Sequence, residues 1–151
     1  MASHFLFIAG ALRERSSRES ADLQLQHGLW GLRSALIADN LARYLDPESC
    51  GWVYVLKEGL GARFTITSGV RAFNLLDAFV RDELRTEARY GYITIGPVQS
   101  WASSPEQDLP VLKRVLDVPD QAELTRRFNL GMHRLTQAQH DALLISIPGA
   151  G

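Results

Sequence analysis

His27-Gly28-Leu29-Trp30-Gly31-Leu32 is the stretch that decides the fold expected for this chain. It follows a short apolar strand and a polar helix, and it leads into an amphipathic helix that runs into a second strand. Glycines on both sides of Trp30 allow a tight turn and carry no side chains, so we expect little to bury the indole ring. Such a ring is free to stack on a flat partner.

The segment before this stretch predicts a strand and a helix. Residues 4–9 are aromatic and β-branched and end at Gly10, as is typical of a strand. Ser16 and Glu19 have the spacing of a capping box, in which each side chain satisfies a free backbone amide at a helix start. We therefore expect a helix over residues 17–29.

The segment after it mixes helices and strands. Ser34 is placed to cap a helix that runs through Leu45 and is stopped by Asp46-Pro47. Strands are expected over residues 52–57, 62–68 and 90–98, and further helices over residues 73–84, 109–116 and from Thr136 onward. This order predicts an α/β (α+β) domain with a curved, mostly antiparallel sheet that closes part-way into a β-barrel, flanked by helices.

Composition favours one domain over residues 1–147. The chain has 151 residues, of which 46% are hydrophobic, enough for a single core. Residues 148–151, Pro-Gly-Ala-Gly, are typical of a linker or the end of an excised domain. The single cysteine, Cys50, excludes an internal disulfide and fits a reducing cytoplasm. No apolar run approaches the length of a membrane span, so we expect no membrane partner.

Motifs of catalysis are missing from the sequence. It contains no G-x-S-x-G elbow, no phosphate-binding Gly-Lys-Ser/Thr loop, no G-x-G-x-x-G and no H-E-x-x-H. His27, His133 and His140 are too scattered to indicate a metal site. We therefore expect no catalytic residue, no metal and no cofactor.

Aromatic and basic side chains are the remaining signals. Large rings fall at the boundaries of elements, at Trp30, Tyr90, Tyr92 and Trp101. Rings in such places stack on nucleic-acid bases as readily as they pack in a core. The formal net charge is -1, so binding to nucleic acid requires a local basic patch. The residues expected to contact phosphate are Arg13, Arg15, Arg18 and Arg33.

Several of these features together resemble the EVE and YTH branch of the PUA-like superfamily. They are the strand at residues 4–9, the Trp-containing turn at 28–31, the Pro-x-x-x-Gly-aromatic-Val-Tyr-Val segment at 47–55, the aromatic-led strand at 90–95, and Gly131-x-x-Arg134-Leu135-Thr136-x-x-Gln139. The resemblance implies a partly open barrel that binds DNA or RNA and holds one modified base, such as a methylated adenine or cytosine, in an aromatic cage.

The resemblance also implies roles for individual residues. The cage begins with the Trp after the first helix, which matches Trp30, and its second wall falls to Tyr90 or Tyr92 where the family has a Trp. Backbone amides at Gly28 and Gly31 are then placed to meet the polar edge of the base, with Leu29 and Trp101 completing the pocket. Relatives of this size often form the DNA-recognition part of modification-dependent restriction systems, with fused or partner motor and nuclease subunits.

Two other classes of function stay open at this point. A small amidohydrolase on the related ASCH scaffold needs a Lys and a Glu in the pocket, and Lys57 and Glu58 are adjacent on an expected strand and so point to opposite faces. A protein-interaction module on the same fold predicts an exposed apolar patch in place of a concave aromatic pocket with arginines at its rim.

Overall fold

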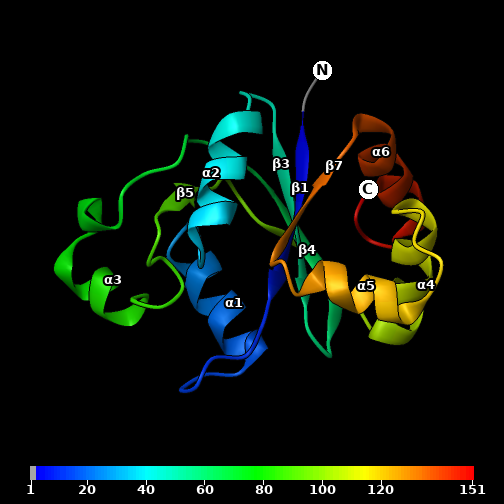
Figure 1. Ribbon diagram of the computed structural model, residues 1–151, viewed down its shortest axis with the longest axis horizontal. Helices are drawn as coiled ribbons and strands as arrows, with labels where there is room; N and C mark the ends of the chain where they lie inside the picture. Colours follow the sequence, from blue (N-terminus) through cyan, green and yellow to red (C-terminus); the bar gives the residue numbers. More distant parts are fainter. Residues whose placement is uncertain (1–2) are drawn as a thin grey trace.

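The computed structural model describes residues 3–151, which form strands and helices in mixed order (Figure 1). The strands are β1 (His4–Ala9), β2 (Leu29–Gly31), β3 (Cys50–Val55), β4 (Gly59–Thr65), β5 (Tyr92–Thr94), β6 (Gln99–Ser100) and β7 (Met132–Leu135). The helices are α1 (Ser17–Gln26), α2 (Ala35–Tyr44), α3 (Ala78–Glu83), α4 (Pro105–Val115), α5 (Gln121–Phe128) and α6 (Gln137–Ser146), with a 3-10 turn at Phe73–Leu75.

The large sheet has the strand order β6-β4-β3-β1-β7. Its central strand β1 pairs in parallel with β3 and antiparallel with β7. Side chains alternate along β1, so that Phe5 and Phe7 point to one face and Leu6 and Ile8 to the other. Figure 1 shows α1, α2 and β5 on one side of the sheet and α4, α5 and α6 on the other. Each face therefore has its own core.

The sheet curls without closing. Beyond the end of β4, Ile66 forms a bridge with Ile95, and the amide of Thr67 donates to the carbonyl of Thr94, so the small sheet of β2 and β5 continues the curve. Within residues 3–151 the strands form two separate sheets, and the expected closure toward a barrel is not found. β2 and β5 have only three residues each and do not extend the hydrogen bonding to β7.

Helix starts were the most predictable local feature. The capping box of Ser16 and Glu19 is present at α1, and Thr136 and Gln139 form a second one at α6. Ser34 caps α2, as expected.

Four elements escaped the sequence analysis, namely β2, β6, α5 and β7. β2 and β6 have only three and two residues, α5 is short and polar, and β7 directly precedes the α6 cap. The predicted helix at 73–84 is divided into the 3-10 turn and α3, and the predicted strand at 90–98 shrinks to β5.

The C-terminal residues pack on the domain. Ala150 is fully buried, and its carbonyl accepts a hydrogen bond from the Arg63 guanidinium at 2.7 Å. A side chain at Gly149 would lie 2.8 Å from Cβ of Trp101. The segment expected to be a linker is therefore in close contact with the sheet. Among residues 3–151, no helix has the length and apolar character needed to cross a membrane.

Candidate functional site

A cavity of about 530 Å³ lies on the face of the large sheet that α1 and α2 cover. Its walls come from the end of β1, from α1, β2 and the start of α2, and from the turn that joins α5 to β7. Most of the lining side chains are apolar, with a few polar groups among them, which is the usual make-up of a small-molecule site.

Trp30 forms part of the cavity wall from strand β2. Its ring centroid lies 5.9 Å from that of Phe7 and 6.3 Å from that of Phe64, and only 4% of the residue is exposed. The expectation of a largely open ring was therefore wrong. The backbone near Trp30 is a strand paired with β5, and this pairing turns the ring onto the aromatic side chains of the sheet.

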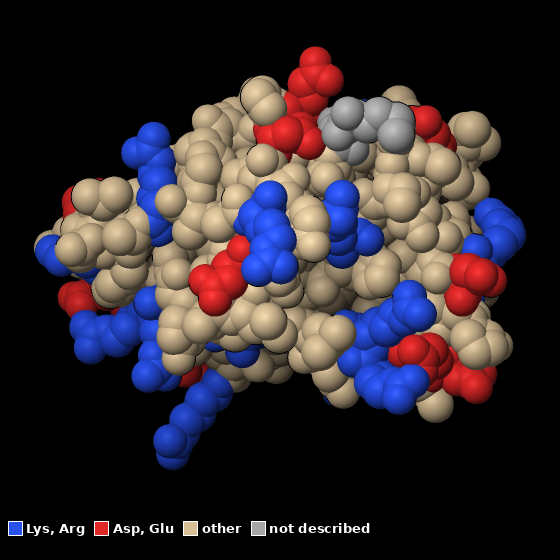
Figure 2. Space-filling view, turned by 45° about the horizontal axis from the view of Figure 1, so that its top comes forward, with Lys and Arg blue, Asp and Glu red and all other residues tan. Residues whose placement is uncertain are grey.

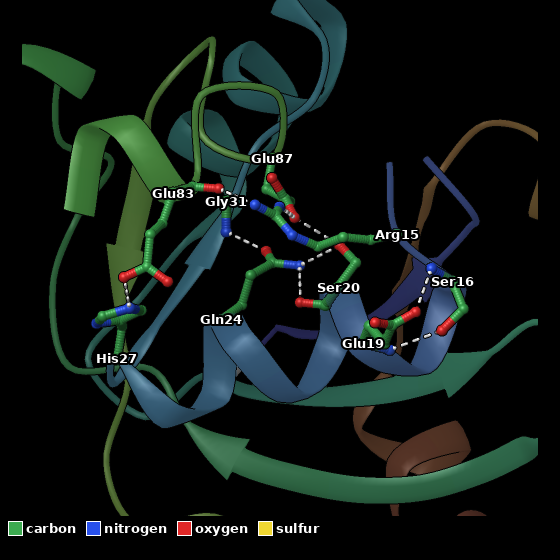
Figure 3. Close-up of polar contacts among 9 residues, drawn as sticks. All are labelled: Arg15, Ser16, Glu19, Ser20, Gln24, His27, Gly31, Glu83 and Glu87. Atoms are coloured by element: carbon green, nitrogen blue, oxygen red, sulfur yellow. Dashed lines mark hydrogen bonds and ion pairs between the residues drawn. The ribbon is translucent and has the colours of Figure 1, made fainter. Parts of the chain in front are cut away.

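A buried polar network supports the wall beside Trp30 (Figure 3). The Oε1 atom of Gln24 accepts a hydrogen bond from the amide of Gly31 at 2.8 Å, and its Nε2 atom donates to the carbonyl of Ser20 at 3.1 Å. The hydroxyl of Ser20 donates to Glu87, whose carboxylate also pairs with Arg15. These bonds fix the side chains of Ser20 and Gln24, which line the cavity, in one orientation.

Glu87 closes this network from the segment between α3 and β5. It is fully buried, and its Oε1 atom has no hydrogen-bond partner among residues 3–151. A side chain at Gly31 would lie 2.3 Å from the carbonyl oxygen of Glu87, so only glycine fits there. The close approach of β2 to this segment thus depends on Gly31.

Of the residues expected to form the base pocket, Trp30 and Gly31 line the cavity. The remaining five, Gly28, Leu29, Tyr90, Tyr92 and Trp101, do not line it. Tyr92 packs with Leu29 in a separate small core, and Tyr90 is 44% exposed beneath the Arg89 guanidinium. Trp101 lies against Trp52 on the opposite face of the sheet. The structure therefore does not bring a second aromatic wall from β5 to Trp30.

Among the four arginines expected to contact phosphate, only Arg33 reaches the cavity. Its guanidinium passes close to Gly10 at the end of β1, and the residue is exposed. The guanidinium of Arg15 is engaged with Glu87, and that of Arg18 pairs with Glu58. Arg13 is exposed and does not line the cavity. Figure 2 shows basic side chains spread over one face of the molecule with acidic ones between them.

Several cavity residues escaped the sequence analysis. The turn at residues 128–131 lines the cavity with Asn129 and Leu130, and the sequence offered one signal for it. A leucine between Asn129 and Gly131 occupies a position where turn chemistry favours polar residues. Ser20 and Gln24 carried no such signal, because polar residues on a polar helix are ordinary.

A second cluster lies at the start of β3, where ligand atoms of His4, Cys50 and His140 are within 4.8 Å of one another. The two imidazole rings stack at 3.8 Å with an angle of 18° between their planes. Imidazole binds a metal through lone pairs in its ring plane, so two stacked rings do not converge on one ion. Both nitrogens of His4 are also engaged, with the Cys50 amide and with Gln137. The arrangement is a hydrogen-bonded packing unit.

Lys57 and Glu58, the pair that an amidohydrolase would require, lie between β3 and β4. Neither lines the cavity, and Glu58 is paired with Arg18.

Comparisons with known proteins establish the fold. No protein-family model and no curated protein sequence matches the chain. A hypothetical protein from Leishmania major has a TM-score of 0.62 at 13% identity, over 96% of this chain and 94% of that one. Human THYN1, solved in complex with 5-methylcytosine-containing DNA, has a TM-score of 0.59 at 16% identity, over 95% and 96%. A Pseudomonas putida protein has a TM-score of 0.57 at 15% identity, over 94% and 97%. The chain thus shares the fold of these three structures over nearly its whole length.

Proposed function

We propose that this chain is a non-catalytic reader of modified DNA that holds one modified base, turned out of the duplex, in the cavity beside Trp30. The observation that carries the proposal is the cavity itself, which has an aromatic wall at Trp30 and an arginine, Arg33, at its opening. Human THYN1, which shares the fold over nearly its whole length, was solved with 5-methylcytosine-containing DNA. Both facts support a methylated cytosine as the first ligand to test.

The apolar lining gives a physical reason for selectivity. A base inside the cavity contacts Trp30 and the neighbouring Phe7 and Ile37, and burying one extra methyl there contributes about 0.8 kcal/mol. That free energy corresponds to about a fourfold difference in affinity between methylated and unmodified DNA. Turning the base out costs a few kcal/mol of stacking and pairing, which the cavity contacts and phosphate contacts must offset.

In this proposal, exposed residues at the opening of the cavity form the hydrogen bonds to the polar edge of the base. The side chains of Gln24 and Ser20 are already engaged with protein groups, so they shape the wall and do not turn toward a ligand. Arg33 and Asn129 are exposed and line the cavity. Arg33 additionally offers a charge to a flanking phosphate.

The decisive experiment is a binding panel of duplexes that differ at one base. Unmodified cytosine, 5-methylcytosine, 5-hydroxymethylcytosine and N6-methyladenine at the same position are titrated by fluorescence anisotropy, with an RNA of the same sequence as a further arm. We expect 5-methylcytosine duplex to bind at least about fourfold more tightly than its unmodified counterpart. Equal affinity for all duplexes would overturn the proposal.

The proposal extends to a biological setting in which the reader belongs to a modification-dependent restriction system with motor or nuclease subunits. The resemblance of the sequence to the EVE and YTH branch supports this setting. It predicts that cells carrying the system restrict phage with modified cytosine more strongly than phage with unmodified DNA. It also predicts that Trp30→Leu abolishes the difference.

A further inference from the structure

The rim of the cavity carries two exposed leucines. Large apolar side chains exposed among residues 3–151 are Leu36, Tyr44, Leu75, Phe79, Tyr90, Leu130 and Ile145, and of these only Leu36 and Leu130 line the cavity. Leu36 is 61% exposed in the first turn of α2, and Leu130 is 58% exposed in the turn between α5 and β7. Exposed apolar groups at the edge of a binding cavity are placed to meet the partner.

The turn that carries Leu130 is held rigidly. The amide of Leu130 donates to the carbonyl of Arg127 at 3.1 Å, and that of Gly131 donates to the carbonyl of Phe128 at 2.9 Å. The carbonyl of Gly131 in turn accepts from Ile8 of β1. Leu130 is therefore presented from a backbone that is tied to the helix before it and to the sheet.

Gly131 brings this turn against α2. Its φ angle is +83°, a conformation that favours glycine, and a Cβ atom there would lie 2.8 Å from Cδ1 of Ile37. The leucine thus stands at a fixed place beside the opening of the cavity, with Leu36 on the neighbouring helix.

We propose that Leu130 is the wedge that enters the base stack and occupies the gap left by the base held in the cavity. This inference rests on the proposed function, because a duplex that loses one base to a cavity keeps a hole next to that cavity. Proteins that unstack DNA insert apolar side chains, leucine among them, between base steps. A single strand has no such hole, so the wedge contributes only to duplex binding.

The test compares Leu130→Ala with the unchanged chain on two probes. One is a duplex with a single 5-methylcytosine, and the other is the modified strand alone. We expect Leu130→Ala to weaken duplex binding by about tenfold or more and to change single-strand binding by less than about twofold. Leu75→Ala is the matched control, because Leu75 is 65% exposed and does not line the cavity.

A second pair of variants separates apolar insertion from mere contact. Leu130→Phe keeps an apolar wedge and should retain most of the duplex affinity, whereas Leu130→Gln should behave like Leu130→Ala. The fluorescence of 2-aminopurine placed next to the modified base should rise on binding of the unchanged chain and rise less with Leu130→Ala.

The outcomes distinguish failure of the wedge from failure of the proposed function. If Leu130→Ala weakens binding to both probes equally, or does not weaken binding to the duplex, the wedge is overturned. The proposed function still stands in either case, because the unchanged chain binds the modified base. If the unchanged chain binds neither probe, the proposed function fails and the wedge falls with it.

Discussion

The two faces of the large sheet each bury a tryptophan, but they use it differently. Trp52 is fully buried between the sheet and the helices on the α4 and α6 side, and its indole Nε1 donates to Nδ1 of His140 at 3.0 Å. Trp30, on the other face, is 4% exposed and forms part of a cavity wall. Near-equal burial therefore hides a difference in surroundings, since one ring is enclosed by packing and the other borders empty space.

The difference teaches that exposure alone does not separate a core residue from a site residue. Protein interiors are packed as densely as organic crystals, so a cavity beside a buried ring is the informative departure. If the comparison is correct, equal substitutions at the two tryptophans have different signatures. Loss of Trp52 should lower stability and leave binding unchanged, whereas loss of Trp30 should lower binding as well as stability.

The largest effect is expected for Trp52→Leu. The substitution leaves a cavity in a closed core and removes the donor to His140, so the free energy of unfolding should fall by about 4 kcal/mol. Urea denaturation followed by circular dichroism measures it. Affinity for modified DNA, expressed per folded molecule, should stay unchanged, and a loss of affinity here would remove the contrast between the two faces.

A smaller loss of stability is expected when the pH is lowered, through His140 beside Trp52. Burial, together with the neighbouring His4, lowers the pKa of His140 to about 4, whereas the unfolded chain protonates it near 6.5. The unfolded state thus takes up a proton first as pH falls, so stability should drop by about 3 kcal/mol between about pH 6.5 and pH 4.

His140→Asn is the matched variant for this pH dependence. The amide oxygen of asparagine is placed to accept from Trp52 as Nδ1 does, but it does not titrate. The fall in stability with acid should be shallower in this variant. The same pH profile in both proteins would show that other groups cause the acid sensitivity.

The difference between contacts that are local in the chain and contacts that are distant explains which features the sequence predicted. Capping boxes at Ser16 and Thr136 depend on neighbours in the chain, so they were predictable. The aromatic and β-branched residues of β1 predicted a strand, but its parallel pairing with β3 depends on contacts forty or more residues apart.

The cavity depends on such distant contacts as well. Trp30 and Arg33 are close in the chain, and both line the cavity. Tyr90 and Tyr92 were expected opposite Trp30, yet Ile93 is the residue paired with it, and Tyr92 points into another core. A strand register that is off by one residue moves a side chain to the opposite face, and the sequence alone does not fix it.

Trp30→Leu is expected to have an intermediate effect and tests the cavity face directly. Because the ring also packs on Phe7 and Phe64, the free energy of unfolding should fall by about 2 kcal/mol, less than for Trp52→Leu. Loss of stacking should weaken binding to 5-methylcytosine DNA by roughly 1–3 kcal/mol. Unchanged binding per folded molecule would make Trp30 a core residue like Trp52 and would remove the basis of the proposed site.

Arg33→Gln should give the smallest effect, confined to electrostatics. Arg33 is exposed at the cavity, so its removal should leave the melting temperature unchanged and reduce the slope of log affinity against log salt concentration by about one. Arg13→Gln is the matched control, since Arg13 is also exposed but does not line the cavity. Its salt slope should match that of the unchanged chain. If both variants reduce the slope equally, the phosphate-binding surface extends beyond the cavity mouth to the segment before α1, as the clustering of arginines in the sequence had predicted.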